Sequence, residues 1–247
     1  MADYQSRVRG AAYEGAAIDE GLRSYMLRVY NYMLMGLVLT GATAWFTASV
    51  PQFGSLFFTI TETGRLASLS PLGWIALFAP VGLVMLLGFR IQHMSLSSVQ
   101  TIFWSYAALN GIALTPILLL YTGVSVARVF FITAATFGAM SLYGYTTKRD
   151  LSGFGSFLFM GLIGIVIASL VNIFLQSSMM SWVLSVIGVG LFTGLTAYDT
   201  QAIKEHYYVN DDGTVAGKKA VMGALQIYLD FINLFLSLLR LLGDRRD

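Results

Sequence analysis

The chain has 247 residues, of which 56% are hydrophobic and only 11% are charged, and its formal net charge is +2. A soluble domain needs roughly 25% charged residues to keep its surface wetted, so this composition excludes an ordinary soluble globule and indicates an integral membrane protein. The weak positive charge gives no footprint for binding nucleic acid, and the absence of cysteine excludes disulfides and thiolate metal sites.

Seven apolar stretches are long enough to cross a bilayer, whose hydrocarbon core of about 30 Å needs roughly 20 mostly apolar residues in a helix. In chain order they are 27–50, 72–89, 101–121, 124–145, 154–175, 179–202 and 221–242. The segment 57–60 is too short to span, and we expect a loop there that dips into the membrane interface. The pattern predicts an all-α membrane protein, a seven-transmembrane-helix bundle over 27–242, with a cytoplasmic N-terminal tail (1–26) and a short C-terminal tail (243–247).

The Lys and Arg residues between the spans predict the orientation, because short cytoplasmic segments are enriched in them. With the N-terminus in the cytoplasm, the cytoplasmic side holds Arg7, Arg9, Arg23, Arg28, Arg90, Lys148, Arg149, Lys204, Lys218 and Lys219. The opposite side holds Arg65, Arg128, Arg240, Arg245 and Arg246, so the three at the C-terminus run against the trend. Either the seventh span crosses against this local bias or it is a re-entrant hairpin, and we favour crossing. The compact loops favour a bacterial inner (plasma) membrane.

Two acidic residues lie inside apolar stretches, Asp199 in the sixth and Asp230 in the seventh. An aspartate at the centre of a span costs about 2.5–3.5 kcal/mol on insertion scales, which indicates a function. Gln226, Asp230, Asn233 and Ser237 recur at helical spacing and form a polar stripe that must face the interior of the bundle. Asp199 is near the cytoplasmic end of its span, and Asp230 is about 15 Å into the next one. We expect the two carboxyl groups to meet in the cytoplasmic half of the bundle.

Two carboxyl groups in contact cannot both ionise cheaply in a low dielectric, so the pair is expected to share one proton. Loss of this proton creates repulsion that a divalent cation relieves, and hard oxygen ligands suit calcium better than zinc. The alternative is a neutral hydrogen-bonded pair that only fastens two helices. Arg90, at the end of the second span, is either a latch that reaches the pair or an anchor at the lipid headgroups.

Two motifs contain these aspartates: Tyr198, Asp199, Thr200 and Gln201 at the end of the sixth span, and 228–235 in the seventh. Asn110, Gly111, Thr115 and Pro116 in the third span and the segment 147–152 add support. Together they resemble the Bax-inhibitor family of transmembrane proteins over roughly 27–242. The resemblance implies a seven-helix bundle with the last helix central and a pH-sensitive calcium leak. Asp199 and Asp230 are then the sensor and gate and transient calcium ligands, and Arg90 is a candidate latch. Some members have a glutamate in the second span, near Ala79 here.

The leading function is therefore a calcium leak whose partners are calcium ions, protons and the lipid bilayer. The alternative is a non-transporting regulator that binds other membrane proteins, such as a protease or a stress-response partner, through a tail such as 1–21. An enzyme is not expected, because no span contains Cys or His and no HExxH motif occurs. We expect no cofactor and no nucleic acid.

Overall fold

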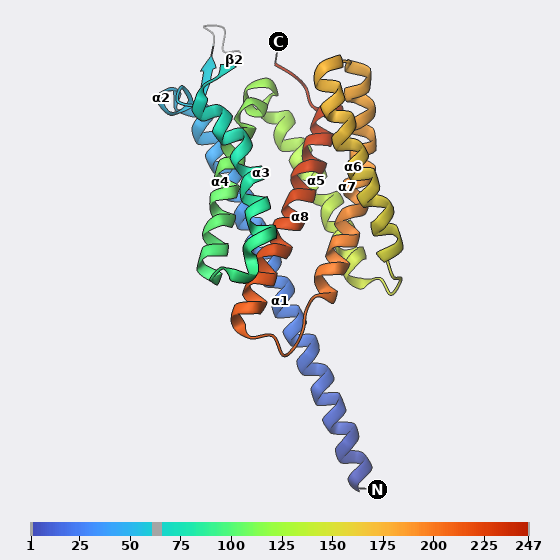
Figure 1. Cartoon of the computed structure of the whole chain (residues 1–247). Coiled ribbons are helices and arrows are strands. Elements are labelled where there is room, and N and C mark those ends of the chain that lie inside the picture. The colour runs from blue at the N-terminus through green and yellow to red at the C-terminus, as the bar shows by residue number, and fades with distance from the viewer. Residues whose placement is uncertain (1, 61–65, 247) are drawn as a thin grey trace.

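The computed structural model describes residues 2–60 and 66–246, which fold into a bundle of long helices (Figure 1). These helices are α1 (Ala2–Ser49), α3 (Pro71–Arg90), α4 (Leu96–Leu120), α5 (Gly123–Thr146), α6 (Ser152–Leu175), α7 (Ser178–Glu205) and α8 (Gly213–Leu242). Within the described residues, each of the seven contains a segment long and apolar enough to cross a membrane. The prediction of an all-α membrane protein with seven spanning helices is confirmed.

Polar caps begin most of these helices close to where the apolar stretches begin. The side chains of Ser70, Ser95, Thr122, Ser177 and Asp212 each accept a hydrogen bond from a backbone N–H in the first turn of the following helix. Gln176 ends α6 in the left-handed conformation, with φ of 49°. The short connections make α3 and α4, α6 and α7, and α7 and α8 antiparallel neighbours that pack against each other. Helix α1 is longer than expected, because it is continuous across residue 26, where we expected the tail to end.

The expectation of an interfacial loop at 57–60 is wrong. Strand β1 (Phe58–Ile60) pairs antiparallel with β2 (Leu66–Leu69), next to the short helix α2 (Pro51–Gly54) (Figure 1). Phe58 is only 3% exposed and packs near Ala76 and Ile112, so hydrophobic burial holds the strand on the bundle. A strand of three residues is too short to show the alternation by which strands are recognised in a sequence.

Helix α8 is the most buried of the seven long helices in the described part of the chain. In its spanning window 72% of the residues are buried, against 39% in α7 and 6% in α6. It packs against α1, α4, α5 and α7, and Figure 1 shows it between α3 and α4 on one side and α6 and α7 on the other. Most side chains of α8 therefore face other helices instead of lipid, which permits polar groups on it.

The last helix crosses the whole bundle. It is a single helix of 30 residues, about 45 Å long, so the re-entrant hairpin does not form. The C-terminus lies at the opposite end of the bundle from the α7–α8 loop (Figure 1). There the backbone N–H of Arg246 donates to the Leu120 carbonyl at 2.9 Å, and Arg128 pairs with Asp244 at 3.0 Å. These contacts hold the C-terminal tail against the turn between α4 and α5.

A glycine on α5 allows that helix to approach α7 closely. A Cβ atom at Gly144 would collide with the backbone carbonyl of Ala197, whereas one at Gly138 would meet nothing within 4 Å. Because the backbone carbonyl cannot move aside, we expect Gly144→Ala to lower the free energy of unfolding by about 1–3 kcal/mol. Gly138→Ala makes the same change on the same helix and should not lower the thermal unfolding midpoint in detergent. Equal losses in both variants would contradict the close approach.

Candidate functional site

Asp199 on α7 and Asp230 on α8 meet inside the bundle. Both residues are 5% exposed and line the same cavity, and their carboxyl groups are close enough to influence each other's ionisation. They come together because α7 and α8 pack against each other and are joined only by the segment 206–212. The geometric expectation that two buried acids from consecutive helices are in contact therefore holds.

A cavity of about 750 Å³ opens beside this carboxyl pair, between α6, α7 and α8. Gln226, Asn233 and the two aspartates contribute polar groups to its wall, and most of the other lining side chains are apolar. The Oδ2 atom of Asp230 is buried and has no hydrogen-bond partner among the described residues. Buried polar atoms are normally satisfied, so a proton or a cation at the pair would complete the bonding of this oxygen.

The carboxyl pair alone is a weak cation site. No three His, Cys, Asp or Glu side chains come together within the residues that the structure describes. Calcium takes about six to eight oxygen ligands, and two carboxylates supply no more than about four. The amide oxygens of Gln226 and Asn233 belong to the same cavity and are further candidate ligands. The arrangement therefore suits a cation that passes through better than one that stays.

The polar stripe predicted on α8 is only partly turned towards the cavity. Gln226, which is exposed, and Asn233, which is partly buried, both line the cavity beside Asp199. Ser237 instead donates from its Oγ atom to the Asn233 carbonyl at 2.8 Å and lies close to Gly188 of α7. Gln226, Asp230 and Asn233 are thus brought together at the cavity, and Ser237 serves the packing of α8 on α7.

Arg90 is not brought to the carboxyl pair. Its side chain is exposed at the end of α3, and α3 packs chiefly against α4. Among the described residues the ion pairs are Arg128 with Asp244 and Lys219 with Asp211, so the two buried aspartates have no basic partner there. The structure therefore gives no support to a latch at Arg90. The position of Arg90 in the sequence does not determine which helices α3 contacts, so the sequence alone did not exclude a latch.

A second cavity, of about 630 Å³, lies at the end of the bundle that contains the α7–α8 loop. Its wall includes His206, Lys218 and Lys219, and also Gln226, which lines the first cavity as well. The Nζ atom of Lys219 is 2.6 Å from the Oδ2 atom of Asp211, which offsets part of the positive charge. Gln226 therefore lies between this second cavity, which we call the loop cavity, and the buried carboxyl pair. Helical spacing alone did not reveal this position.

Tyr228 fastens α8 to two other helices and was missed in the sequence. Its hydroxyl group lies 2.6 Å from Thr40 Oγ1 on α1 and 2.7 Å from Asn110 Nδ2 on α4. Thr40 Oγ1 also donates to the Ala107 carbonyl at 2.9 Å, so the Tyr228 hydroxyl donates to Thr40 and accepts from Asn110. The side-chain amide of Asn110, within an apolar stretch, is a sign in the sequence that a hydrogen-bond partner exists. That partner, Tyr228, is 118 residues away in the chain, so the sequence does not identify it.

The residues that follow Asp199 fix the position of α7. Thr200 Oγ1 lies 3.0 Å from Ser141 Oγ on α5, which lies 2.5 Å from the Tyr30 hydroxyl on α1. The Gln201 side chain accepts from one backbone N–H and donates to one backbone carbonyl of the α5–α6 loop, both at 2.8 Å. The motif around Asp199 therefore combines one candidate functional carboxyl group with two structural anchors.

The sequence is similar to known proteins over almost its whole length. A family described as "Inhibitor of apoptosis-promoting Bax1" matches residues 22–247. The inner membrane protein YbhL of Escherichia coli is 47% identical, over 92% of this chain and 94% of its own. An uncharacterized protein of Rickettsia prowazekii is 49% identical over the whole of both chains, and one of Caulobacter vibrioides is 45% identical over 94% of this chain and 92% of its own.

Proposed function

The chain is a bacterial member of the Bax-inhibitor family of membrane proteins, and on that premise we propose that it is a pH-sensitive calcium leak in which Asp199 and Asp230 sense protons and gate the passage of calcium. The observation that supports this most strongly is a buried pair of carboxyl groups beside a cavity, without a basic partner among the described residues. The proposal includes a location in the bacterial inner membrane with the N-terminus in the cytoplasm, which the distribution of Lys and Arg favours.

A shared proton closes the leak in this proposal. A protonated carboxyl group donates a hydrogen bond to its ionised partner, which joins α7 to α8. When the proton is lost, two negative charges face each other in a poorly screened environment. The repulsion is relieved if the helices separate or if a divalent cation enters between the carboxylates. Calcium flux is therefore low at acidic pH and rises as the pH increases.

The cavity beside the carboxyl pair has few other titratable groups in its wall among the described residues. On the wall of its cavity, the one further titratable side chain in the described part of the chain is Tyr198. His206, Lys218 and Lys219 line the loop cavity on the other side of Gln226. A His206→Gln control therefore tests whether the pH response belongs to the carboxyl pair.

Calcium entry into proteoliposomes that contain the purified protein tests the proposed function. We expect entry to be faster at a mildly alkaline than at a mildly acidic pH, and the His206→Gln variant to keep this difference. Equal rates at the two pH values, or no calcium entry above that of empty liposomes, would refute the leak.

Gln226 offers a test of the route by which calcium reaches the pair. Replacing its amide by the apolar side chain of Leu removes the polar group between the two cavities, and a polar contact to a charged species is worth about 1.5–3 kcal/mol. We therefore expect Gln226→Leu to slow calcium entry at alkaline pH roughly tenfold. Gln52→Leu, at an exposed glutamine of α2, should have no effect. Unchanged entry in Gln226→Leu would exclude the route through the loop cavity.

A further inference from the structure

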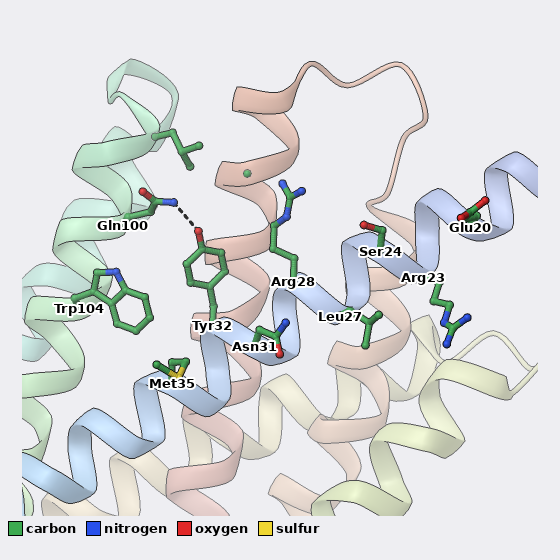
Figure 2. A pocket seen from close by; sticks show the side chains of 12 residues that line it. Glu20, Arg23, Ser24, Leu27, Arg28, Asn31, Tyr32, Met35, Gln100 and Trp104 are labelled. Atoms are coloured by element: carbon green, nitrogen blue, oxygen red, sulfur yellow. Dashed lines mark hydrogen bonds between the residues drawn. The ribbon is translucent and has the colours of Figure 1, made fainter.

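A groove on the surface of the bundle lies between α1 and α4, beside the start of α8 (Figure 2). It encloses about 760 Å³ and is separate from the cavity at the carboxyl pair. Helices α1 and α4 run in the same direction here. Tyr32 of α1 is hydrogen-bonded to Gln100 of α4, and further along both helices Thr40 is hydrogen-bonded to Ala107. The groove therefore extends from the starts of the spans into the bundle.

The wall of the groove changes from polar to apolar along its length. Ser24 and Arg28 line the end near the helix starts, and Met35 and Trp104 line the other end. Ser24, Arg28, Tyr32 and Met35 are spaced by four, four and three residues, so they share one face of α1 over about 17 Å. A phospholipid shows the same order of groups, from a polar headgroup to apolar acyl chains.

The polar end of the groove is positively charged and rich in hydrogen-bond donors. Arg23 and Arg28 line it with one acidic residue, Glu20, and neither arginine forms an ion pair with a described residue. Gln100 Nε2 donates to the Tyr32 hydroxyl oxygen at 2.5 Å, so the hydroxyl proton is available to a further acceptor. Figure 2 shows Arg28 and Tyr32 projecting from the same side of α1. A planar guanidinium group and a nearby hydroxyl group can together donate hydrogen bonds to the oxygens of one phosphate group.

We infer that this groove binds an anionic phospholipid, with its phosphate at Arg28 and an acyl chain along Met35 and Trp104. The occupant is a lipid instead of a free phosphate because the surface that continues from the groove along α1 is apolar and exposed at Leu34 and Val38. Such side chains lie among acyl chains in a bilayer, whereas arginines at span ends extend to the headgroups, where anionic lipids attract them. The lipid bridges α1 and α4 at the end of the bundle where both spans begin.

Retention of lipid by the detergent-purified protein, measured by native mass spectrometry, tests this inference. Wild-type protein should retain phosphatidylglycerol in preference to phosphatidylcholine, because only the former carries a net negative charge. Arg28→Gln should lower the retention of phosphatidylglycerol roughly tenfold, as expected for the loss of one charge-assisted contact. Arg28→Lys keeps the charge but not the planar fork, and should lie between the two.

Arg90→Gln is the matched control, because Arg90 is exposed at the same end of the bundle but outside the groove. It should retain phosphatidylglycerol like the wild type. The same loss in both Gln variants, or equal retention of both lipids by the wild type, would overturn the inference. Displacement of phosphatidylglycerol by inorganic phosphate would identify a phosphate site and overturn the assignment to lipid. Unfolding midpoints in lipid-free detergent show whether each variant is folded. If Arg28→Gln is unfolded, the retention of phosphatidylglycerol by Arg28→Lys is compared with that of the wild type instead.

Discussion

Replacing Asp199 and Asp230 together by asparagine is expected to abolish the pH response of calcium entry into proteoliposomes and to leave the rate near its low acidic value. Asparagine has the shape of a protonated aspartate but cannot lose a proton, so the pair stays neutral and no repulsion develops between α7 and α8. The ratio of rates at alkaline and acidic pH should therefore fall to about one. Each single variant should also lose most of the response, because one remaining carboxylate can still accept a hydrogen bond from the introduced amide.

Asp150→Asn is the matched control for this experiment. Asp150 lies in the loop between α5 and α6, where hydrogen bonds from the side chain and backbone of Ser152 hold the pKa of the Asp150 carboxyl below its usual range. A carboxyl group with a lowered pKa stays ionised throughout the tested interval, so its removal should leave the pH response intact. An unchanged rate and pH response in the double variant would refute the carboxyl pair as sensor. A cellular effect that required 1–21 but not calcium flux would instead favour a regulator of other membrane proteins.

The spans and the proximity of the two aspartates could both be predicted from the sequence, because both follow from the energetic cost of polar groups in a bilayer. A bilayer penalises each polar group that it contacts, so long apolar stretches and isolated acids within them have few structural explanations. Asp199 and Asp230 then had to face the interior, and the short link between their helices placed them together. The contact between these two side chains follows from local sequence and a general energetic constraint.

Features that depend on which distant helices pack together could not be predicted. Its position in the chain leaves Arg90 either a latch at the pair or an anchor at the headgroups, and only the structure shows that α3 packs chiefly on α4 and leaves this side chain exposed. Gln226 belongs to a recognisable stripe, yet its place between two cavities depends on α6 and on the loop before α8. The hydrogen bonds of Tyr228 join three helices, and no spacing within one helix indicates them.

Tyr228 provides the largest effect on stability that we expect from a single substitution. Its side chain is fully buried, and its ring packs against those of Phe103 and Tyr106 in edge-to-face geometry. Tyr228→Ala removes the ring and leaves a cavity between α1, α4 and α8, which should cost about 3–5 kcal/mol of unfolding free energy. Tyr228→Phe keeps the ring but leaves Asn110 without this hydrogen-bond partner, which should cost about 1–3 kcal/mol.

The difference between these two variants separates packing from hydrogen bonding, and unfolding midpoints in one detergent are sufficient to measure it. Tyr143→Ala removes the same atoms from a half-exposed position on α5 and should cost much less than Tyr228→Ala. A further variant, Asn110→Leu combined with Tyr228→Phe, replaces both hydrogen-bonding partners by apolar groups and should recover part of the loss, since no amide is then left unsatisfied. If Tyr228→Phe were as stable as the wild type, the hydrogen bonds of Tyr228 with Thr40 and Asn110 would not hold α8 in place. The position of Asp230, two residues further along the same helix, would then depend on packing alone.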